Sequence, residues 1–402
     1  MQTVQPESVG LSSSRLERVD RAMQKYVDQN LFAGVIVLVA RQGQVAWLRK
    51  YGWQDIAAKR PMSFDTIFRI YSMTKPITST AVMMLVEEGK IHLFDPLSRY
   101  VPAFKNPKVM QARNGCDFEL VPAKREPTIQ DLLTHTAGLS YGGDENSALD
   151  ALYRKDLWKL LEKEPGKTLE EMVNLLARLP LANHPGTVFR YSLAIDVLGY
   201  IVQVVSEKPF DEFLKEAIFD PLGMVDTAFW VPEEKADRLA VVYTPQEGGG
   251  IKVVDEAHAL QSRNYFRPPS WPSGGGGLVS TIGDYYRFGQ MLLNGGVLDG
   301  VRLLGRKTVE WMMQNHLPDG LRQDTDQMGA NGFGLGGFVL LNPGLSPRPG
   351  SAGKFGWGGA ANTEWWIDPA EQLHCILMTQ YFPGFTLPLV EDFAQTVYQA
   401  LE

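Results

Sequence analysis

The feature that most constrains the fold is a Ser-x-x-Lys motif, Ser72 to Lys75, directly ahead of a strongly apolar segment. Residues 77–89 contain the unbroken apolar run 81–86, which is typical of a helix buried on all sides. Pro76 is tolerated only near a helix start, and Gly89 is a typical stop, so we expect one helix from about Ser72 to Gly89. The preceding segment, 66–71, predicts a short strand, which places Ser72 at a strand-to-helix junction.

This position suits nucleophilic chemistry. A spacing of three residues puts Ser72 and Lys75 side by side on one helix face. A serine hydroxyl is a weak nucleophile that needs an adjacent base, and a lysine that has lost its proton can serve. The backbone N–H of Ser72 at the helix start can donate to an oxyanion. Taken alone, the motif also fits an N-cap serine followed by a solvated lysine.

Hydrophobic periodicity predicts sheet and helix at both chain ends and a helical middle. Strands are predicted at 34–40, 45–51, 333–341, 362–367 and 373–380, and helices at 12–30, 129–135, 169–179, 194–206, 210–218, 281–294, 305–314 and 389–401. This order predicts an α/β chain of the α+β type. We expect one sheet domain built from residues 1–90 and 272–402, an inserted, mainly helical domain at 91–271, and an active site at their interface. Gly248 to Gly250 is expected to be a surface loop.

Composition excludes several classes of function. The chain has 402 residues, 44% of them apolar, and a net charge of −7, so it has the length for a large core, and nucleic acid is an unfavourable partner. Cys116 and Cys375 lie far apart, which predicts neither a disulfide framework nor a zinc site, and no cofactor is expected. The polar segment 1–31 has no signal-peptide pattern, and no apolar run has the length of a membrane span. We therefore expect a cytoplasmic protein without membrane contact, as a monomer or small homo-oligomer.

Three further stretches complete a pattern that begins with Ser72 to Lys75. They are Leu-Leu-Thr-His-Thr-Ala-Gly-Leu-Ser-Tyr at 132–141, Pro-Gly-Thr-Val-Phe-Arg-Tyr-Ser-Leu at 185–193 and Gly-Trp-Gly-Gly-Ala at 356–360. In this order they resemble the serine β-lactamase and penicillin-binding superfamily, and within it the class C β-lactamase-like esterases called family VIII carboxylesterases. The resemblance covers nearly the whole chain and implies a β-lactamase-like fold, with an antiparallel sheet flanked by helices.

The resemblance implies roles for individual residues. Ser72 would be the nucleophile that forms an acyl-enzyme, Lys75 would share its proton network, and Tyr191 would be the general base. A tyrosine ordinarily ionises near pH 10, so it needs a nearby cation such as Lys75 to act at neutral pH. The N–H groups of Ser72 and Ala360 would form the oxyanion hole. The residues predicted to bind the oxyanion or the substrate are Ala360, Trp357, Gly358, Gly359, Tyr141 and Leu193.

Two departures from the family pattern concern specificity. Class C β-lactamases carry asparagine where this chain has Leu193, and β-lactamases carry the lysine of Lys-Thr-Gly where it has Trp357. In β-lactamases, that asparagine and that lysine contact the amide and the carboxylate of the β-lactam. A site that lacks both side chains does not select substrates with an amide and a carboxylate. We therefore expect a carboxylesterase that favours short acyl chains, does not require a carboxylate on the ester, and has weak or no β-lactamase activity.

Several motifs are decoys. Residues 138–142 spell G-x-S-x-G around Ser140, but a helical pattern precedes them where a nucleophile elbow needs a strand. Residues 332–337 match G-x-G-x-x-G, but strand and turn follow where a dinucleotide fold needs a helix. His135 and His184 are interpreted as structural hydrogen-bonding residues, and no His or Cys pair indicates a metal site.

Three rival functions remain open. An acyltransferase on the same fold would form the same acyl-enzyme and pass it to an alcohol. A D-amino-acid peptidase or penicillin-binding activity is disfavoured by Trp357, which stands where a lysine is expected. A non-catalytic binding protein that kept the fold is disfavoured by the joint presence of Ser72, Lys75 and Tyr191.

Overall fold

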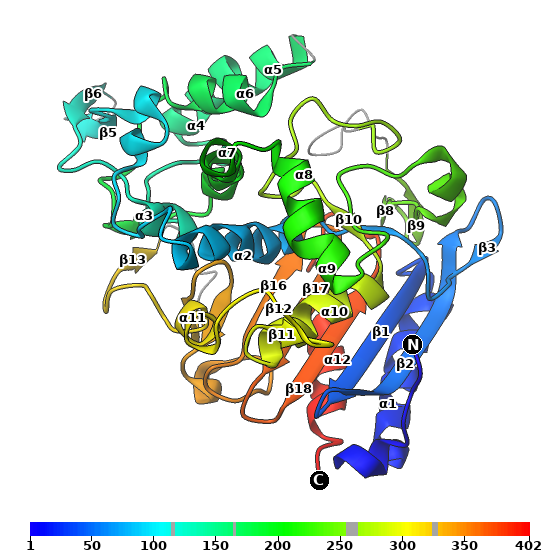
Figure 1. The fold of residues 1–402 in the computed structure, drawn as a ribbon. Helices are drawn as coiled ribbons and strands as arrows, with labels where there is room; N and C mark the ends of the chain where they lie inside the picture. The colour runs from blue at the N-terminus through cyan, green and yellow to red at the C-terminus, as the bar shows by residue number, and fades with distance from the viewer. Residues whose placement is uncertain (114–116, 164–165, 255–263, 324–328) are drawn as a thin grey trace.

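An eight-stranded antiparallel sheet forms the centre of the computed structural model, which describes residues 1–113, 117–163, 166–254, 264–323 and 329–402 (Figure 1). The sheet joins the two ends of the chain, because the N-terminal strand β1 pairs directly with the last strand, β18. In spatial order the strands are β14 (Asn331–Phe333), β15 (Phe338–Leu340), β16 (Phe355–Gly359), β17 (Thr363–Asp368), β18 (Leu373–Met378), β1 (Gly34–Arg41), β2 (Gln44–Asp55) and β3 (Arg60–Pro61).

Helices cover both faces of this sheet. The helices α1 (Ser13–Asp28) and α12 (Leu389–Tyr398) pack against each other on one face, and α10 (Ile282–Leu293) packs on the other. Side chains alternate along a strand, so neighbouring residues enter different cores. On β17, Trp365 belongs to the core under α10, whereas Trp366 belongs to the core under α1 and α12.

The predicted buried helix is α2 (Thr74–Glu87), which begins two residues after Ser72 and is followed by Gly89 in the left-handed region. Every residue from Thr74 to Met83 is buried, as the apolar pattern predicts. The helix packs against α7 (Ala194–Ser206) of the middle segment. One core cluster therefore continues across the expected boundary at residue 90, and the division into two domains stays a prediction.

The middle segment contains short helices and two hairpins. Its remaining helices are α3 (Ile129–Leu133), α4 (Ala148–Leu152), α5 (Lys159–Lys163), α6 (Leu169–Leu176), α8 (Phe210–Leu214) and α9 (Asp220–Leu222), with π-helical turns at Tyr153–Trp158 and Lys215–Phe219. Its hairpins pair β5 (Lys108–Arg113) with β6 (Asp117–Pro122), and β8 (Tyr243–Pro245) with β9 (Ile251–Val253). Gly248 to Gly250 all have positive φ and form the turn between β8 and β9, as expected of a surface loop.

The small elements complete the chain. They are the pairs β4 (Phe68–Arg69) with β10 (Val279–Ser280), β11 (Val297–Leu298) with β12 (Val301–Arg302) and β13 (Arg322–Gln323) with β7 (Val188–Phe189), the helix α11 (Arg306–Met312), and 3₁₀ turns at Pro6–Val9, Tyr71–Met73, Leu97–Arg99, Pro102–Phe104, Glu233–Arg238 and Pro343–Leu345.

Two strand predictions are wrong in extent. The predicted strand 333–341 is a hairpin, because the glycines between β14 and β15 form its turn and Gly336 has a φ of 109°. The predicted strand 66–71 shortens to β4, because Tyr71 adopts a φ of 43° and starts a 3₁₀ turn. Cys116 lies outside the described residues, and Cys375 is a buried free thiol.

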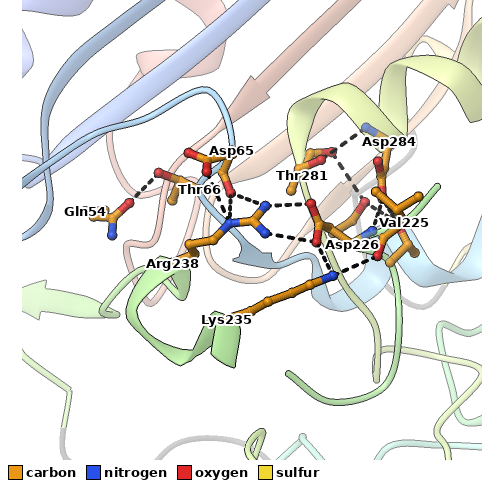
Figure 2. A network of polar contacts seen from close by, with 11 residues as sticks. Gln54, Asp65, Thr66, Val225, Asp226, Lys235, Arg238, Thr281 and Asp284 are labelled. Carbon is orange, nitrogen blue, oxygen red and sulfur yellow. Dashed lines mark hydrogen bonds and ion pairs between the residues drawn. The ribbon is translucent and has the colours of Figure 1, made fainter. Parts of the chain in front are cut away.

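A polar network fastens residues 225–238 to the sheet region (Figure 2). The Asp226 carboxylate accepts hydrogen bonds from Lys235 Nζ at 2.7 Å and from Arg238 Nη2 at 2.5 Å. Arg238 Nε also donates to the Asp65 carbonyl at 2.9 Å, and the Asp226 N–H donates to Asp284 Oδ2 at 2.7 Å. Burial alone would raise the pKa of Asp226, but hydrogen bonds from Arg238 and Lys235 lower it below its ordinary value.

Candidate active site

Ser72 and Lys75 lie together at the start of α2. Ser72 is in the 3₁₀ turn Tyr71–Met73, and Lys75 is 1% exposed. Lys75 Nζ donates to Ser72 Oγ at 3.0 Å and to the Gly275 carbonyl at 2.6 Å. Lys75 Nζ is therefore held between the serine hydroxyl and a backbone carbonyl.

Two tyrosines face this ammonium. Lys75 Nζ lies 4.5 Å from the ring centroid of Tyr191 and 5.5 Å from that of Tyr141. The Tyr191 hydroxyl accepts a hydrogen bond from Trp357 Nε1 at 3.2 Å. A cation over an aromatic ring is an attractive contact, so both rings help to hold Lys75 in place.

The end of β16 reaches the turn that carries Ser72. Gly359 lies against the backbone of Ile70, so closely that an added Cβ would collide with the Ile70 carbonyl oxygen. Ala360 follows Gly359 at the end of the strand, and its carbonyl accepts from the Gly384 N–H at 2.8 Å. Ala360 and Ser72 therefore lie in the lining of the same cleft.

A cleft of about 610 Å³ opens in front of these groups. Residues from the 3₁₀ turn Tyr71–Met73, from the segment before α7, from β14 to β17 with the loops around them, and from α12 line it: Ser72, Tyr191, Gly329, Ala330, Asn331, Phe338, Leu345, Ser346, Pro347, Arg348, Lys354, Trp357, Gly358, Gly359, Ala360, Glu364, Trp366, Phe385 and Ala394. Lys75 lies buried behind Ser72, and the Tyr141 ring packs 5.4 Å from that of Tyr191. Leu193 is fully buried in the core and does not line the cleft.

Ser140 lies in a buried ion-pair cluster. It is 2% exposed, and its hydroxyl donates to Asp150 Oδ1 at 2.6 Å. Arg190 Nη2 donates to the same oxygen at 2.9 Å and to Ser140 Oγ at 3.2 Å. The Ser140 hydroxyl is buried and hydrogen-bonded to a carboxylate and a guanidinium, which is a structural role. The interpretation of G-x-S-x-G as a decoy agrees with this arrangement.

The histidines near these motifs make structural contacts. The Ser192 N–H donates to His135 Nδ1 at 3.3 Å, and the His135 ring packs 4.7 Å from that of Tyr191. Burial, together with the nearby charge of Lys75, lowers the pKa of His135 well below its ordinary value, so this ring is neutral. His184 contacts Gln111 Nε2 at 3.0 Å.

A family model described as Beta-lactamase matches residues 19–395. The chain belongs to the Beta-lactamase family. Protein Rv1367c of Mycobacterium tuberculosis (strain ATCC 25618 / H37Rv) is 35% identical over 91% of this chain and 90% of its own length. Esterase EstB of Burkholderia gladioli is 30% identical over 98% of each chain. Among solved structures, EstCE1, described as a hydrolase with promiscuous acyltransferase activity, has a TM-score of 0.80 and 28% identity over 96% of this chain and 99% of its own.

These matches confirm the predicted β-lactamase-like fold and the resemblance to esterases of the serine β-lactamase superfamily. Relatives named esterase and hydrolase support a hydrolase on this fold. Within the described residues, no helix is long and apolar enough to span a membrane. The same part of the chain contains no group of three or more His, Cys, Asp or Glu residues placed to hold a metal ion.

The sequence patterns of this Beta-lactamase family member missed several groups in the site. The Gly275 carbonyl that accepts from Lys75 belongs to a loop for which no motif predicts a partner. Arg348, Lys354 and Glu364 enter the cleft because of the pairing of β15, β16 and β17. Spacing along the chain carries no signal for such a cluster, because strand register decides it.

Proposed function

We propose that this protein is a carboxylesterase that cleaves short acyl esters through an acyl-enzyme on Ser72. The observation that carries the proposal is the 3.0 Å contact between Lys75 Nζ and Ser72 Oγ beside Tyr191, at the wall of a cleft. A nucleophile within hydrogen-bond reach of a basic group, with a further group that orients it, is the arrangement that covalent catalysis requires.

The first half-reaction transfers the acyl group to the enzyme. Tyr191, as general base, takes the proton of Ser72 while Oγ bonds to the ester carbonyl carbon. The carbonyl electrons move to the oxygen, and the N–H groups of Ser72 and Ala360 stabilise this oxyanion. The intermediate collapses, the ester C–O bond breaks, and the alcohol leaves with the proton that Tyr191 returns.

The second half-reaction returns the free enzyme. A water molecule gives its proton to Tyr191 and attacks the acyl carbon, and the bond to Ser72 Oγ breaks as that oxygen regains a proton. An alcohol in place of water would give acyl transfer. This second candidate is supported by the description of EstCE1, which combines hydrolase and acyltransferase activity.

The experiment is a p-nitrophenyl ester series from acetate to octanoate. We expect an initial burst of p-nitrophenol equal to the enzyme concentration and the highest kcat/KM for the short chains. No turnover, together with no labelling by a serine-directed phosphonate, would refute the enzyme hypothesis. A preference for long chains would refute only the proposed substrate range.

Two further assays separate the alternatives on this fold. Product analysis with an added acceptor alcohol distinguishes hydrolysis from acyl transfer, because only the latter yields a new ester. Trp357 supplies an indole where β-lactamases supply a cation, so a chromogenic cephalosporin should turn over weakly or not at all. Labelling by a fluorescent penicillin tests the penicillin-binding alternative, and we expect none.

A further inference from the structure

The part of the cleft away from Ser72 holds charged residues that the proposed mechanism does not use. Arg348, Lys354 and Glu364 line the same cleft as Ser72. Arg348 is already paired, since its Nη1 donates to Glu364 Oε1 at 2.9 Å and its Nε donates to Glu391 Oε1 at 2.9 Å. Two carboxylates on one guanidinium leave no unpaired positive charge at Arg348.

Lys354 is a buried cation in a different position. Lys354 is 5% exposed, and its Nζ donates to the Pro349 carbonyl at 2.9 Å. Among the described residues, no carboxylate oxygen lies within the 4.0 Å of an ion pair from this ammonium. Nζ also lies 5.7 Å from the ring centroid of Trp366 and 5.6 Å from that of Tyr398.

The donors of Lys354 are not all used. A lysine ammonium carries three N–H donors, and the described contacts occupy one of them. A buried charge is costly unless it is paired. Burial, and then the charge of Arg348, lower the pKa of Lys354 to about 8, although the charges of Glu364 and Asp368 act in the opposite direction. These two carboxylates lie near Lys354 without forming an ion pair with it, and they do not fully offset the cost of its burial.

The strand geometry connects Lys354 to the catalytic end. Lys354 directly precedes β16, and alternation along the strand places it on the same sheet face as Gly356 and Gly358. Their cross-strand partners Trp366 and Glu364 line the cleft from that face. Lys354 and Gly359 are five positions apart, so roughly 16 Å of chain, at about 3.3 Å per residue, runs between them.

We infer that this end of the cleft binds a carboxylate on one arm of the ester substrate, with the Lys354 ammonium as its partner. The inference rests on the proposed ester hydrolysis and names its substrate class. A substrate carboxylate would pair directly with the ammonium, which Glu364 and Asp368 do not contact, and would use its free donors. This carboxylate site differs from the expectation drawn from the sequence, which was an ester without a required carboxylate. That expectation considered Leu193 and Trp357, which carry no charge, and did not include Lys354.

An ammonium-bearing substrate is the competing possibility at this end. Glu364 is the acidic group in the cleft lining, and its Oε1 is already committed to Arg348. Burial raises the pKa of Glu364, which further weakens it as a partner for an incoming cation. Lys354 therefore determines the sign of the charge that this end prefers.

The test uses matched esters that differ only in charge. For the acyl arm, the p-nitrophenyl half-ester of dodecanedioic acid, whose extended chain matches the distance to Lys354, is compared with its methyl-capped diester. For the alcohol arm, the acetate ester of 12-hydroxydodecanoate is compared with that of its methyl ester. We expect wild-type kcat/KM to favour the carboxylate member of at least one pair by about 10-fold, the size of one charge-assisted hydrogen bond.

Variants assign the preference to Lys354. Lys354→Met keeps the length of the side chain and removes its charge, so the ratio within the favoured pair should fall to about one. Lys354→Arg keeps the charge and should retain the preference. Lys307→Met removes a surface charge, on a side chain that is 79% exposed, and should leave the ratio at the wild-type value.

The outcomes separate this inference from the proposed function. Equal rates within both pairs, or a higher rate for an ammonium-bearing ester of the same length, would overturn the carboxylate site while ester hydrolysis stands. A preference that survives in Lys354→Met would overturn the assignment to Lys354. Failure to hydrolyse any ester, including p-nitrophenyl acetate, would refute the proposed function and this inference with it.

Discussion

The replacement Gly359→Ala should damage catalysis by moving the end of β16. An added Cβ would lie about 1 Å inside the 3.4 Å of ordinary contact with the Ile70 carbonyl oxygen. That oxygen is fixed from the other side, because it accepts the Met73 N–H at 3.0 Å in the turn that carries Ser72. The added Cβ would also collide with Thr363 Oγ1, a side-chain atom that can rotate away, whereas the Ile70 carbonyl is backbone. The strand end and the Ser72 turn must therefore separate by about 1 Å.

This separation acts on the proposed oxyanion hole. The two N–H donors belong to Ser72 and Ala360, one on each side of the contact that Gly359 makes with Ile70. A 1 Å misplacement of reacting groups costs about 100-fold in rate, and a 100-fold loss corresponds to about 2.7 kcal/mol of transition-state stabilisation. We expect kcat/KM for p-nitrophenyl acetate to fall by about this factor.

The assay pairs steady-state kinetics with thermal unfolding of the same samples. Gly143→Ala is the matched control, because Gly143 does not have positive φ and no heavy atom lies within 4 Å of an added Cβ there. The control should keep wild-type kcat/KM. If folded Gly359→Ala hydrolyses the ester at the wild-type rate, the argument from the close approach of β16 to Ile70 is wrong.

Three further predictions concern single contacts. Trp357→Phe removes the N–H that donates to the Tyr191 hydroxyl, so kcat should fall about 5- to 10-fold, equivalent to one hydrogen bond of about 1 kcal/mol; an unchanged kcat would show that the contact has no role. Burial lowers the pKa of His374 to about 3, so between that value and about 6.5 the unfolded chain binds a proton that the folded chain does not. Stability should therefore fall by about 2 kcal/mol from this residue as the pH drops from 7 to 5, and denaturant titrations of His374→Gln should lack that part of the pH dependence. Asp226→Asn leaves Lys235 and Arg238 without their shared carboxylate and should lower the free energy of unfolding by about 1–3 kcal/mol, whereas Glu310→Gln, in an exposed surface pair, should leave it nearly unchanged.

Local sequence patterns predicted the elements with strong periodicity or clear stops. The apolar run after Lys75 predicted α2, because a helix without a polar face has to be buried. The apolar runs at 34–40 and 45–51 predicted the two strands that pair as β1 and β2. The strand prediction at 333–341 failed because its glycines, which already matched a decoy motif, form a turn.

Sequence motifs predicted those site residues that lie within a recognisable motif. Ser72, Lys75 and Tyr191 stand in recognisable stretches, and the structure brings all three together. Leu193 stands in a motif as well, but its side chain points into the core. Lys354 stands in no motif, because its place in the cleft follows from the register of β16 with its neighbours.

The most direct test of the central claim compares wild type, Ser72→Ala and Ser140→Ala in p-nitrophenyl acetate hydrolysis and in labelling by a serine-directed phosphonate, with mass spectrometry to locate the adduct. The account predicts that Ser72→Ala abolishes both turnover and labelling. It also predicts that Ser140→Ala still forms an adduct on Ser72, because the Ser140 hydroxyl is buried against Asp150. An adduct on Ser140, or full activity in Ser72→Ala, would contradict the Ser-x-x-Lys mechanism.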